Sequence, residues 1–162
     1  MQALARQSAV VDSEVVSRVC PLLTAGVRLV VHRVIRNRGT VCGCLAHADS
    51  ASELPAVLLA LGGNVIARST RGDRVIPAGE LFTDVFETAL ATDELLAEAW
   101  FPASRGQFAI IEESRRLVDF AIGGVVRDAD TSGICGLAHI QLLDCTDEPT
   151  RRQRACGALG AH

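Results

Sequence analysis

The 162-residue chain is 49% apolar and 22% charged, and it has a formal net charge of −3. This length is enough for one domain or for two small lobes that share a core, and the apolar content argues against disorder of the whole chain. Because phosphate backbones require a clustered excess of basic side chains, the small acidic excess argues against nucleic-acid binding.

The first part of the chain is predicted to be helical and then irregular. Residues 13–32 carry apolar side chains at helical spacing after Ser13, which is a suitable N-cap. Pro21 is expected to kink this helix or to start a second one. Residues 36–39 form a predicted polar turn, residues 40–45 are small and partly β-prone, and a polar loop follows.

A helix and a β-hairpin are predicted in the middle of the chain. The helix covers residues 53–61 and ends at the glycine pair 62–63, a common C-terminal stop. Residues 64–69 are β-prone, and a turn at residues 71–73 leads back into residues 74–77. The two short segments are therefore expected to pair as an antiparallel hairpin.

The second half is predicted to consist mostly of strands. Together with the helices, they indicate an α+β fold in which helices cover one side of a mostly antiparallel sheet. A boundary near residues 102–105 divides the chain into predicted lobes of residues 1–102 and 103–162. The remaining predicted elements are a short helix or loop over residues 80–86, strands over residues 95–101, 106–112, 118–126 and 133–143, and a helix over residues 148–159.

The apolar runs and the cysteines indicate where the chain would be found. The longest runs, residues 54–61 and 120–126, are far shorter than the ~20 residues that cross a bilayer. Residues 1–13 lack a basic-then-apolar signal pattern. The six cysteines include no C-x-x-C pair and are expected as thiols. We therefore expect no membrane span, no metal site and a cytoplasmic location.

The segment from Ile35 to Leu54 carries the candidate binding chemistry. Its glycine and small residues allow backbone N–H groups to approach a ligand, and such groups can cradle a pyrophosphate. The Thr40 hydroxyl can add a hydrogen bond, and the carboxylates of Asp49 and Glu53 suit sugar hydroxyls. A purely structural turn would have a similar composition, and the segment lacks the G-x-G-x-x-G of a nicotinamide-binding βαβ unit.

Extended to Pro55, this segment resembles the second flavin-binding motif of the molybdenum hydroxylase flavoproteins, I-R-N-x-G-T-[IV]-G-G-[SN]-L-A-x-A-D-P-A-[AS]-[DE]-L-P. This family includes the medium subunit of carbon monoxide dehydrogenase and its relatives, and the FAD domain of xanthine dehydrogenase. The likeness continues in residues 94–98 and in residues 118–125, which are similar to the D-F-A-x-[VA]-G-V strand of the family's C-terminal domain. It covers roughly residues 14–143.

The resemblance implies an FAD-binding electron-transfer subunit of a molybdenum hydroxylase-type oxidoreductase. Its fold would be the second lobe of a PCMH-type FAD-binding domain, followed by a partial flavoprotein C-terminal α+β domain. Electrons would pass from a [2Fe-2S] small subunit through FAD to an acceptor, and substrate chemistry would occur in a molybdenum-cofactor large subunit. No catalytic residue is predicted in this chain. The implied cofactor-binding residues are Thr40, Val41, Cys42, Gly43, Cys44, Asp49, Glu53 and Leu96.

The chain departs from the family pattern at two cysteines. Cys42 stands where the pattern has glycine and Cys44 where it has Ser or Asn, near the implied pyrophosphate and ribityl chain, whereas Leu96 would pack near the flavin or adenine. If the replaced glycine needed a positive φ, a Cβ at Cys42 would cost about 1–2 kcal/mol. The family's glycine-rich first flavin loop has no counterpart before Ile35, so we expect an N-terminally incomplete chain that is inactive alone.

Two other interpretations remain open at this level. In the first, the chain is a non-enzymatic remnant of the family that no longer binds flavin and acts only through subunit contacts. In the second, it is an unrelated α+β binding module and the motif match is a coincidence. Retention of FAD distinguishes the first alternative from the flavoprotein interpretation, and the strand order tests the second.

Overall fold

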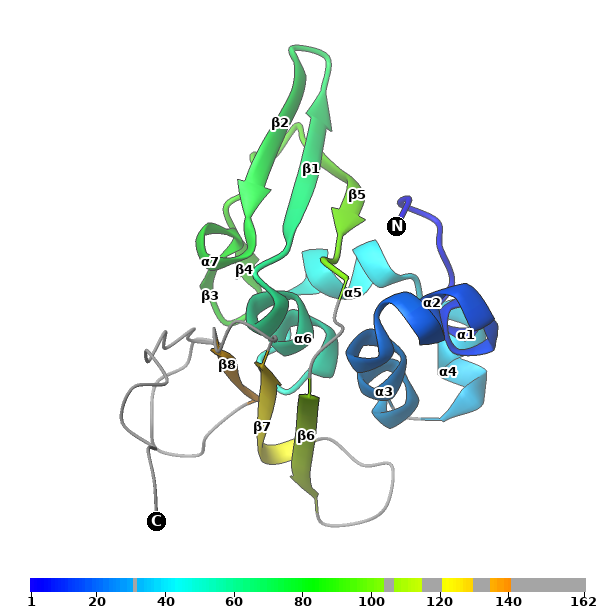
Figure 1. Ribbon diagram of the computed structural model, residues 1–162. Coiled ribbons are helices and arrows are strands. Elements are labelled where there is room, and N and C mark those ends of the chain that lie inside the picture. The colour runs from blue at the N-terminus through cyan, green and yellow to red at the C-terminus, as the bar shows by residue number, and fades with distance from the viewer. Residues whose placement is uncertain (31, 104–106, 115–120, 130–134, 141–162) are drawn as a thin grey trace.

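N-terminal helices, a central helix, two three-stranded antiparallel sheets and one two-stranded sheet make up the computed structural model (Figure 1). The structure describes residues 1–30, 32–103, 107–114, 121–129 and 135–140. The helices are α1 (Gln7–Asp12), α2 (Glu14–Val19), α3 (Pro21–Leu29), α4 (Arg33–Arg38), α5 (Val41–His47), α6 (Glu53–Leu61) and α7 (Ala78–Leu81). The strands are β1 (Asn64–Ser69), β2 (Gly72–Pro77), β3 (Phe82–Asp84), β4 (Glu87–Thr88), β5 (Leu95–Trp100), β6 (Gln107–Ser114), β7 (Ala121–Ala129) and β8 (Cys135–Ile140).

The helical segment predicted over residues 13–32 forms two helices, α2 and α3, and the predicted break at Pro21 is confirmed. Ser13 caps α2, because its side-chain oxygen accepts a hydrogen bond from the Val16 N–H at 3.3 Å. Pro21 is the first residue of α3, a position where its missing N–H costs nothing. The short helix α1 was not predicted, since only Gln7 and Val10 of its six residues are buried.

Two of the predicted irregular segments are helical, so those predictions are wrong. The predicted turn over residues 36–39 is the last turn of α4, and the β-prone residues 40–45 lie mainly in α5. The Thr40 side chain caps α5 by accepting a hydrogen bond from the Gly43 N–H at 3.0 Å. Val41 and Leu45, one helical turn apart, are fully buried, so tertiary packing overrides the weak β-propensity.

The predicted helix over residues 53–61 and the hairpin after it are confirmed. The helix is α6, and Gly62 ends it in the left-handed conformation with φ 63°. Strand β1 pairs with β2 from Asn64↔Pro77 to Ser69↔Gly72, and its other edge pairs with β5. The hairpin extends away from the helices, as Figure 1 shows.

The second sheet has the strand order β6-β7-β8, and its strands lie within a few residues of the predicted segments. The sheet packs against α6, and β6 also contacts α3 (Figure 1). The segment over residues 80–86, which was predicted to be a short helix or loop, contains the end of α7 and the strand β3. The helix predicted over residues 148–159 lies outside the described residues.

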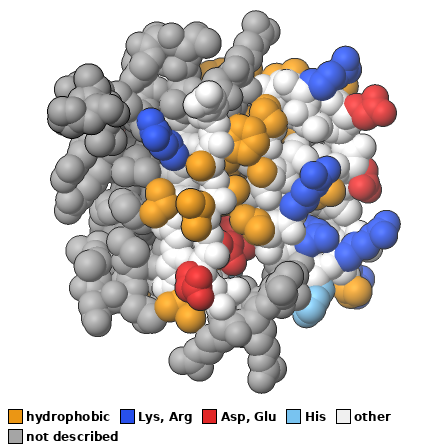
Figure 2. All heavy atoms as spheres, turned by 60° about the horizontal axis from the view of Figure 1, so that its bottom comes forward, with side chains coloured by type: hydrophobic (Ala, Val, Ile, Leu, Met, Phe, Trp, Pro, Cys, Tyr) orange, Lys and Arg blue, Asp and Glu red, His pale blue; other side chains and the backbone are white. Residues whose placement is uncertain are grey.

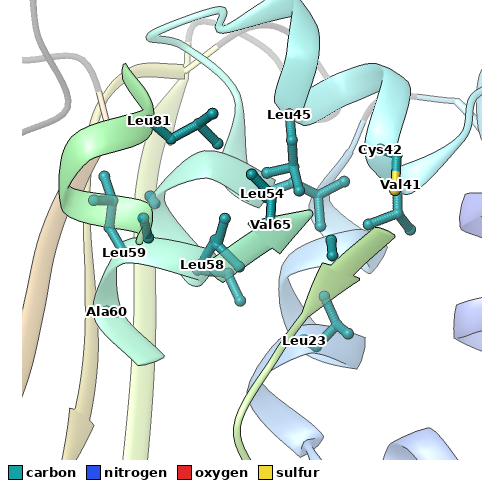
Figure 3. Packing of buried hydrophobic residues seen from close by; sticks show 14 of the residues in the cluster. Leu23, Val41, Cys42, Leu45, Leu54, Leu58, Leu59, Ala60, Val65 and Leu81 are labelled. Carbon is teal, nitrogen blue, oxygen red and sulfur yellow. The ribbon is translucent and has the colours of Figure 1, made fainter. Parts of the chain in front are cut away.

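The core surrounds α6. Residues 53–60 of this helix are all buried, because the helices α3, α5 and α7 and the strands β7 and β8 contact it. Figure 3 shows Leu54, Leu58 and Leu59 of α6 among core side chains from neighbouring elements, including Leu45 and Leu81. A helix that is apolar on all sides is expected in such a position. No helix among the described residues is long and apolar enough to span a membrane.

Candidate functional site

A pocket of about 440 Å³ lies where α1, α4, α5 and the start of α6 meet. Its volume is within the range of small-molecule sites. Five of the predicted cofactor residues line it: Thr40, Gly43, Cys44, Asp49 and Glu53. The other lining residues are Gln7, Val30, Ile35, Gly39, His47, Ala51 and Ser52.

The N-terminal turn of α5 forms one wall of this pocket. The N–H groups of Val41, Gly43 and Cys44 donate to the Ala5 carbonyl oxygen, Thr40 Oγ1 and the Thr40 carbonyl oxygen, at 2.9, 3.0 and 3.1 Å. A Cβ at Gly43 would lie 2.6 Å from Thr40 Oγ1, so the cap leaves no room for a side chain there. Since these three N–H groups are already hydrogen-bonded, polar contacts with a ligand depend mainly on side chains.

Cys44 connects this wall to the start of α6. Its Sγ lies 3.0 Å from the Oγ of Ser52, the N-cap residue of α6. Burial raises the pKa of Cys44 to about 11, and the negative charges of Glu53 and Asp49 add to this rise. The thiol is therefore protonated at neutral pH, and Cys44 presents a neutral sulfur to the pocket.

Two carboxyl groups lie at the same pocket, in different environments. Asp49 Oδ1 accepts a hydrogen bond from the Ala51 N–H at 2.9 Å, which closes the loop before α6. Glu53 is only 7% exposed, and burial raises its pKa to about 7, with a further contribution from the nearby Glu112. Below that pH Glu53 carries a proton and can donate as well as accept, whereas the sequence suggested only an ionised acceptor.

Three predicted cofactor residues place their side chains away from this pocket. Val41 and Cys42 are buried on the core side of α5, as Figure 3 shows. Cys42 is helical, so the expected cost of a positive φ does not arise, and its Sγ lies 3.8 Å from the Met1 carbonyl oxygen. Leu96 is buried on β5, where it pairs with Ala67 of β1.

Sequence reasoning missed several lining residues because they belong to segments outside the motif or have no distinctive chemistry. Gln7 lies 33 residues before Thr40 in the sequence. A hydrogen bond of 3.0 Å from the Gln7 N–H to the Gly39 carbonyl oxygen connects α1 to this part of the motif. His47 ends α5, with its ring 5.0 Å from the ring of Phe86. No local pattern in the sequence marks either contact.

A sequence profile of the FAD binding domain in molybdopterin dehydrogenase matches residues 1–104. The chain belongs to this family. It is 40% identical over 157 residues to the 6-hydroxypseudooxynicotine dehydrogenase complex subunit alpha of Paenarthrobacter nicotinovorans, covering 94% of this chain and 53% of that protein. It is 41% identical over 116 residues to the nicotine 6-hydroxylase medium subunit of the same organism, covering 72% of this chain and 41% of that protein.

The fold also resembles that of a solved structure. The carbon monoxide dehydrogenase structure from Hydrogenophaga pseudoflava matches with a TM-score of 0.83 and 25% identity, over 91% of this chain and 52% of that one. The α+β prediction is thereby confirmed, and the interpretation as an unrelated module is wrong. The chain spans about half the length of the relatives that it matches.

Proposed function

We propose that this chain forms part of the FAD-binding medium subunit of a molybdenum hydroxylase-type dehydrogenase complex. Residues 1–102 would be the second lobe of the FAD-binding domain, and residues 103–162 would begin the C-terminal flavoprotein domain. Family membership over residues 1–104 supports the proposal, as do relatives that are subunits of dehydrogenases. The observation that carries it is the convergence of five motif residues on one pocket.

The side chains of the pocket fit the polar part of FAD. The Thr40 hydroxyl already accepts the hydrogen bond from Gly43, so its proton is available to a phosphate or sugar oxygen. Asp49 keeps a second carboxyl oxygen for a sugar hydroxyl, and Glu53 can donate or accept. Gly43 and Cys44 would form the uncharged surface beside them, while Val41, Cys42 and Leu96 would support α5 and β5 from the core.

The role in catalysis is electron transfer. Bound FAD supplies a carrier that exchanges electrons with [2Fe-2S] clusters and with a final acceptor. This chain would bind and orient that carrier, and substrate oxidation would take place in a molybdenum-cofactor large subunit. The expected partners are therefore that large subunit and a [2Fe-2S] small subunit.

Flavin retention tests the proposal. The purified 162-residue chain is incubated with FAD and desalted, and its visible absorption spectrum is recorded. We expect flavin bands to remain with the wild-type chain. A colourless protein at all FAD concentrations would contradict the proposal and favour the interpretation as a remnant that no longer binds flavin.

A matched pair of variants makes this test specific to the pocket. Asp49 and Asp84 each accept a hydrogen bond from a nearby backbone N–H, but only Asp49 lines the pocket. We expect Asp49→Ala to weaken FAD binding roughly tenfold, the usual effect of losing one hydrogen bond to a charged group. Asp84→Ala is expected to retain FAD like the wild-type chain.

A further inference from the structure

The amide oxygen of Gln7 is buried without a hydrogen bond. The residue is 4% exposed, and its Oε1 has no hydrogen-bond partner in the described part of the chain. An unpaired buried carbonyl group destabilises a folded protein, because it has lost its hydrogen bonds to water and has formed no others. Such groups are rare in native structures, so each one calls for a physical explanation.

Gln7 lies in the wall of the candidate FAD pocket. Its N–H donates to the Gly39 carbonyl oxygen at 3.0 Å, which holds the start of α1 against the end of α4. Gln7 is one of the residues that line the same pocket as Thr40 and Asp49. The unpaired oxygen therefore belongs to a residue of the pocket wall.

Gly39 provides a second, independent observation. Its φ of −66° and ψ of 144° suit any residue, so the backbone does not require glycine. A Cβ at Gly39 would instead lie 3.0 Å from Gln7 Oε1 and 3.1 Å from Gln7 Cδ. The glycine thus leaves space for the Gln7 amide, and an added methyl group would displace it.

We propose that Gln7 is a ligand-binding residue whose Oε1 accepts a hydrogen bond from a sugar hydroxyl of FAD. This inference rests on the proposed function. An unpaired acceptor requires a ligand group that carries a proton, and ribose and ribityl hydroxyls carry one, whereas ionised phosphate oxygens do not. The carboxyl groups of Asp49 and Glu53 line the same pocket, and they also favour hydroxyl groups over phosphate.

The decisive variant is Gln7→Met, because methionine is unbranched and of similar length but has no carbonyl acceptor. FAD affinity of the full 162-residue chain is measured by quenching of flavin fluorescence, and the thermal midpoint is measured without ligand. We expect FAD to bind about tenfold more weakly. The ligand-free chain should be as stable as the wild-type chain or more stable, because the variant removes the unpaired oxygen.

Thr24→Val is the matched control. Thr24 is 2% exposed and its Oγ1 is also buried without a partner among the described residues, but it lies on α3 and does not line this pocket. Valine has nearly the same shape without the hydroxyl. We expect Thr24→Val to keep or raise the thermal midpoint and to leave FAD affinity unchanged.

Two further measurements locate the contact. Lumiflavin has the flavin ring without a sugar chain, so its affinity should be equal for the wild-type chain and for Gln7→Met. Gly39→Ala should weaken FAD binding in the wild-type chain but have little further effect in Gln7→Met, because both changes act on the same amide. Additive losses would contradict a shared contact.

The outcomes separate this inference from the proposed function. A wild-type chain that does not bind FAD overturns both. A wild-type chain that binds FAD, together with Gln7→Met of equal affinity, overturns only the inference. If Gln7→Met loses thermal stability along with affinity, Gln7 has a structural role and the inference is also overturned.

Discussion

Gly39 and Gly43 are glycines because of neighbouring polar side chains. A Cβ at Gly39 would approach the Gln7 amide, and a Cβ at Gly43 would lie 2.6 Å from the Thr40 hydroxyl oxygen. Neither Gly39 nor Gly43 has a positive φ. Cys42 can replace a glycine of the family pattern because its side chain points into the core. The space around each position, and not its φ, therefore decides which residues it accepts.

Glu53→Gln is expected to remove a pH-dependent loss of stability. Burial raises the pKa of Glu53 to about 7, so the folded chain favours the protonated carboxyl group. The associated stability is fully present below pH ~4.5, the pKa of an unfolded glutamate, and is lost as the pH rises through about 7. At pH 8 the variant should be more stable than the wild-type chain by up to roughly 3 kcal/mol.

The measurement is urea denaturation of both chains from pH 4 to pH 8. The two free energies of unfolding should converge at low pH and diverge through pH 7. Glu113→Gln serves as the control, since Glu113 is exposed on β6 and its replacement should change stability by less than about 0.5 kcal/mol. A constant difference between wild-type and Glu53→Gln across this range would contradict the prediction.

At the scale of elements, the helices α3 and α6 pack closely against each other in the core. Gly26 of α3 is buried, and a Cβ there would lie 2.7 Å from Val57 Cγ2 of α6. Small residues allow helices to pack at short distance. On the face of the molecule in Figure 2, several arginine side chains lie toward one side, and hydrophobic side chains lie nearer the middle. The absence of a side chain at Gly26 thus leaves room for Val57, and α3 can pack closely against α6.

Gly26→Ala and Gly79→Ala are expected to change stability in opposite directions. Alanine at residue 26 would clash with Val57, and overpacking of this kind costs about 1–3 kcal/mol. Alanine at residue 79 in α7 would meet no atom within 4 Å, so the higher helix propensity should stabilise the chain by about 0.5–1 kcal/mol. Chemical denaturation measures both changes. Equal effects at the two positions would show that α3 and α6 do not pack as described.

At the scale of the whole molecule, one hydrophobic cluster joins the two sheets. It includes Val65 of β1 and Ala99 of β5 as well as Ala121 and Val126 of β7. The helix α6 contacts β7 and precedes β1, so it lies between the two sheets (Figure 1). The two three-stranded sheets, which lie on either side of the predicted boundary near residues 102–105, therefore share one core, and we expect them to unfold together.

Val126→Ala tests this coupling. Val126 is fully buried, and loss of its two methyl groups should lower the free energy of unfolding by roughly 2 kcal/mol. Trp100 on β5, the only tryptophan, reports on the other lobe by fluorescence. We expect the Trp100 transition to shift by the same amount as the transition measured by circular dichroism. An unchanged Trp100 transition would mean that the lobes unfold independently.

Local signals in the sequence account for the elements that were predicted correctly. Ser13 caps α2, Pro21 starts α3, and Gly62 ends α6, each by chemistry that acts within a few residues. The prediction was wrong for α5 because its first turn depends on distant groups. The Val41 N–H donates to the Ala5 carbonyl oxygen, and the buried side of the helix packs in the core. Neither contact can be recognised from the composition of residues 40–45.

The sequence by itself determined the family and the α+β class, because the flavin motif and the hydrophobic periodicity are local patterns. Only the tertiary structure decided which motif residues face the pocket. In a helix, successive side chains point in different directions, so Cys42 enters the core while Cys44 reaches the pocket. The position of Gln7 in the pocket wall also follows only from the tertiary structure, because folding of the chain brings α1 beside Gly39.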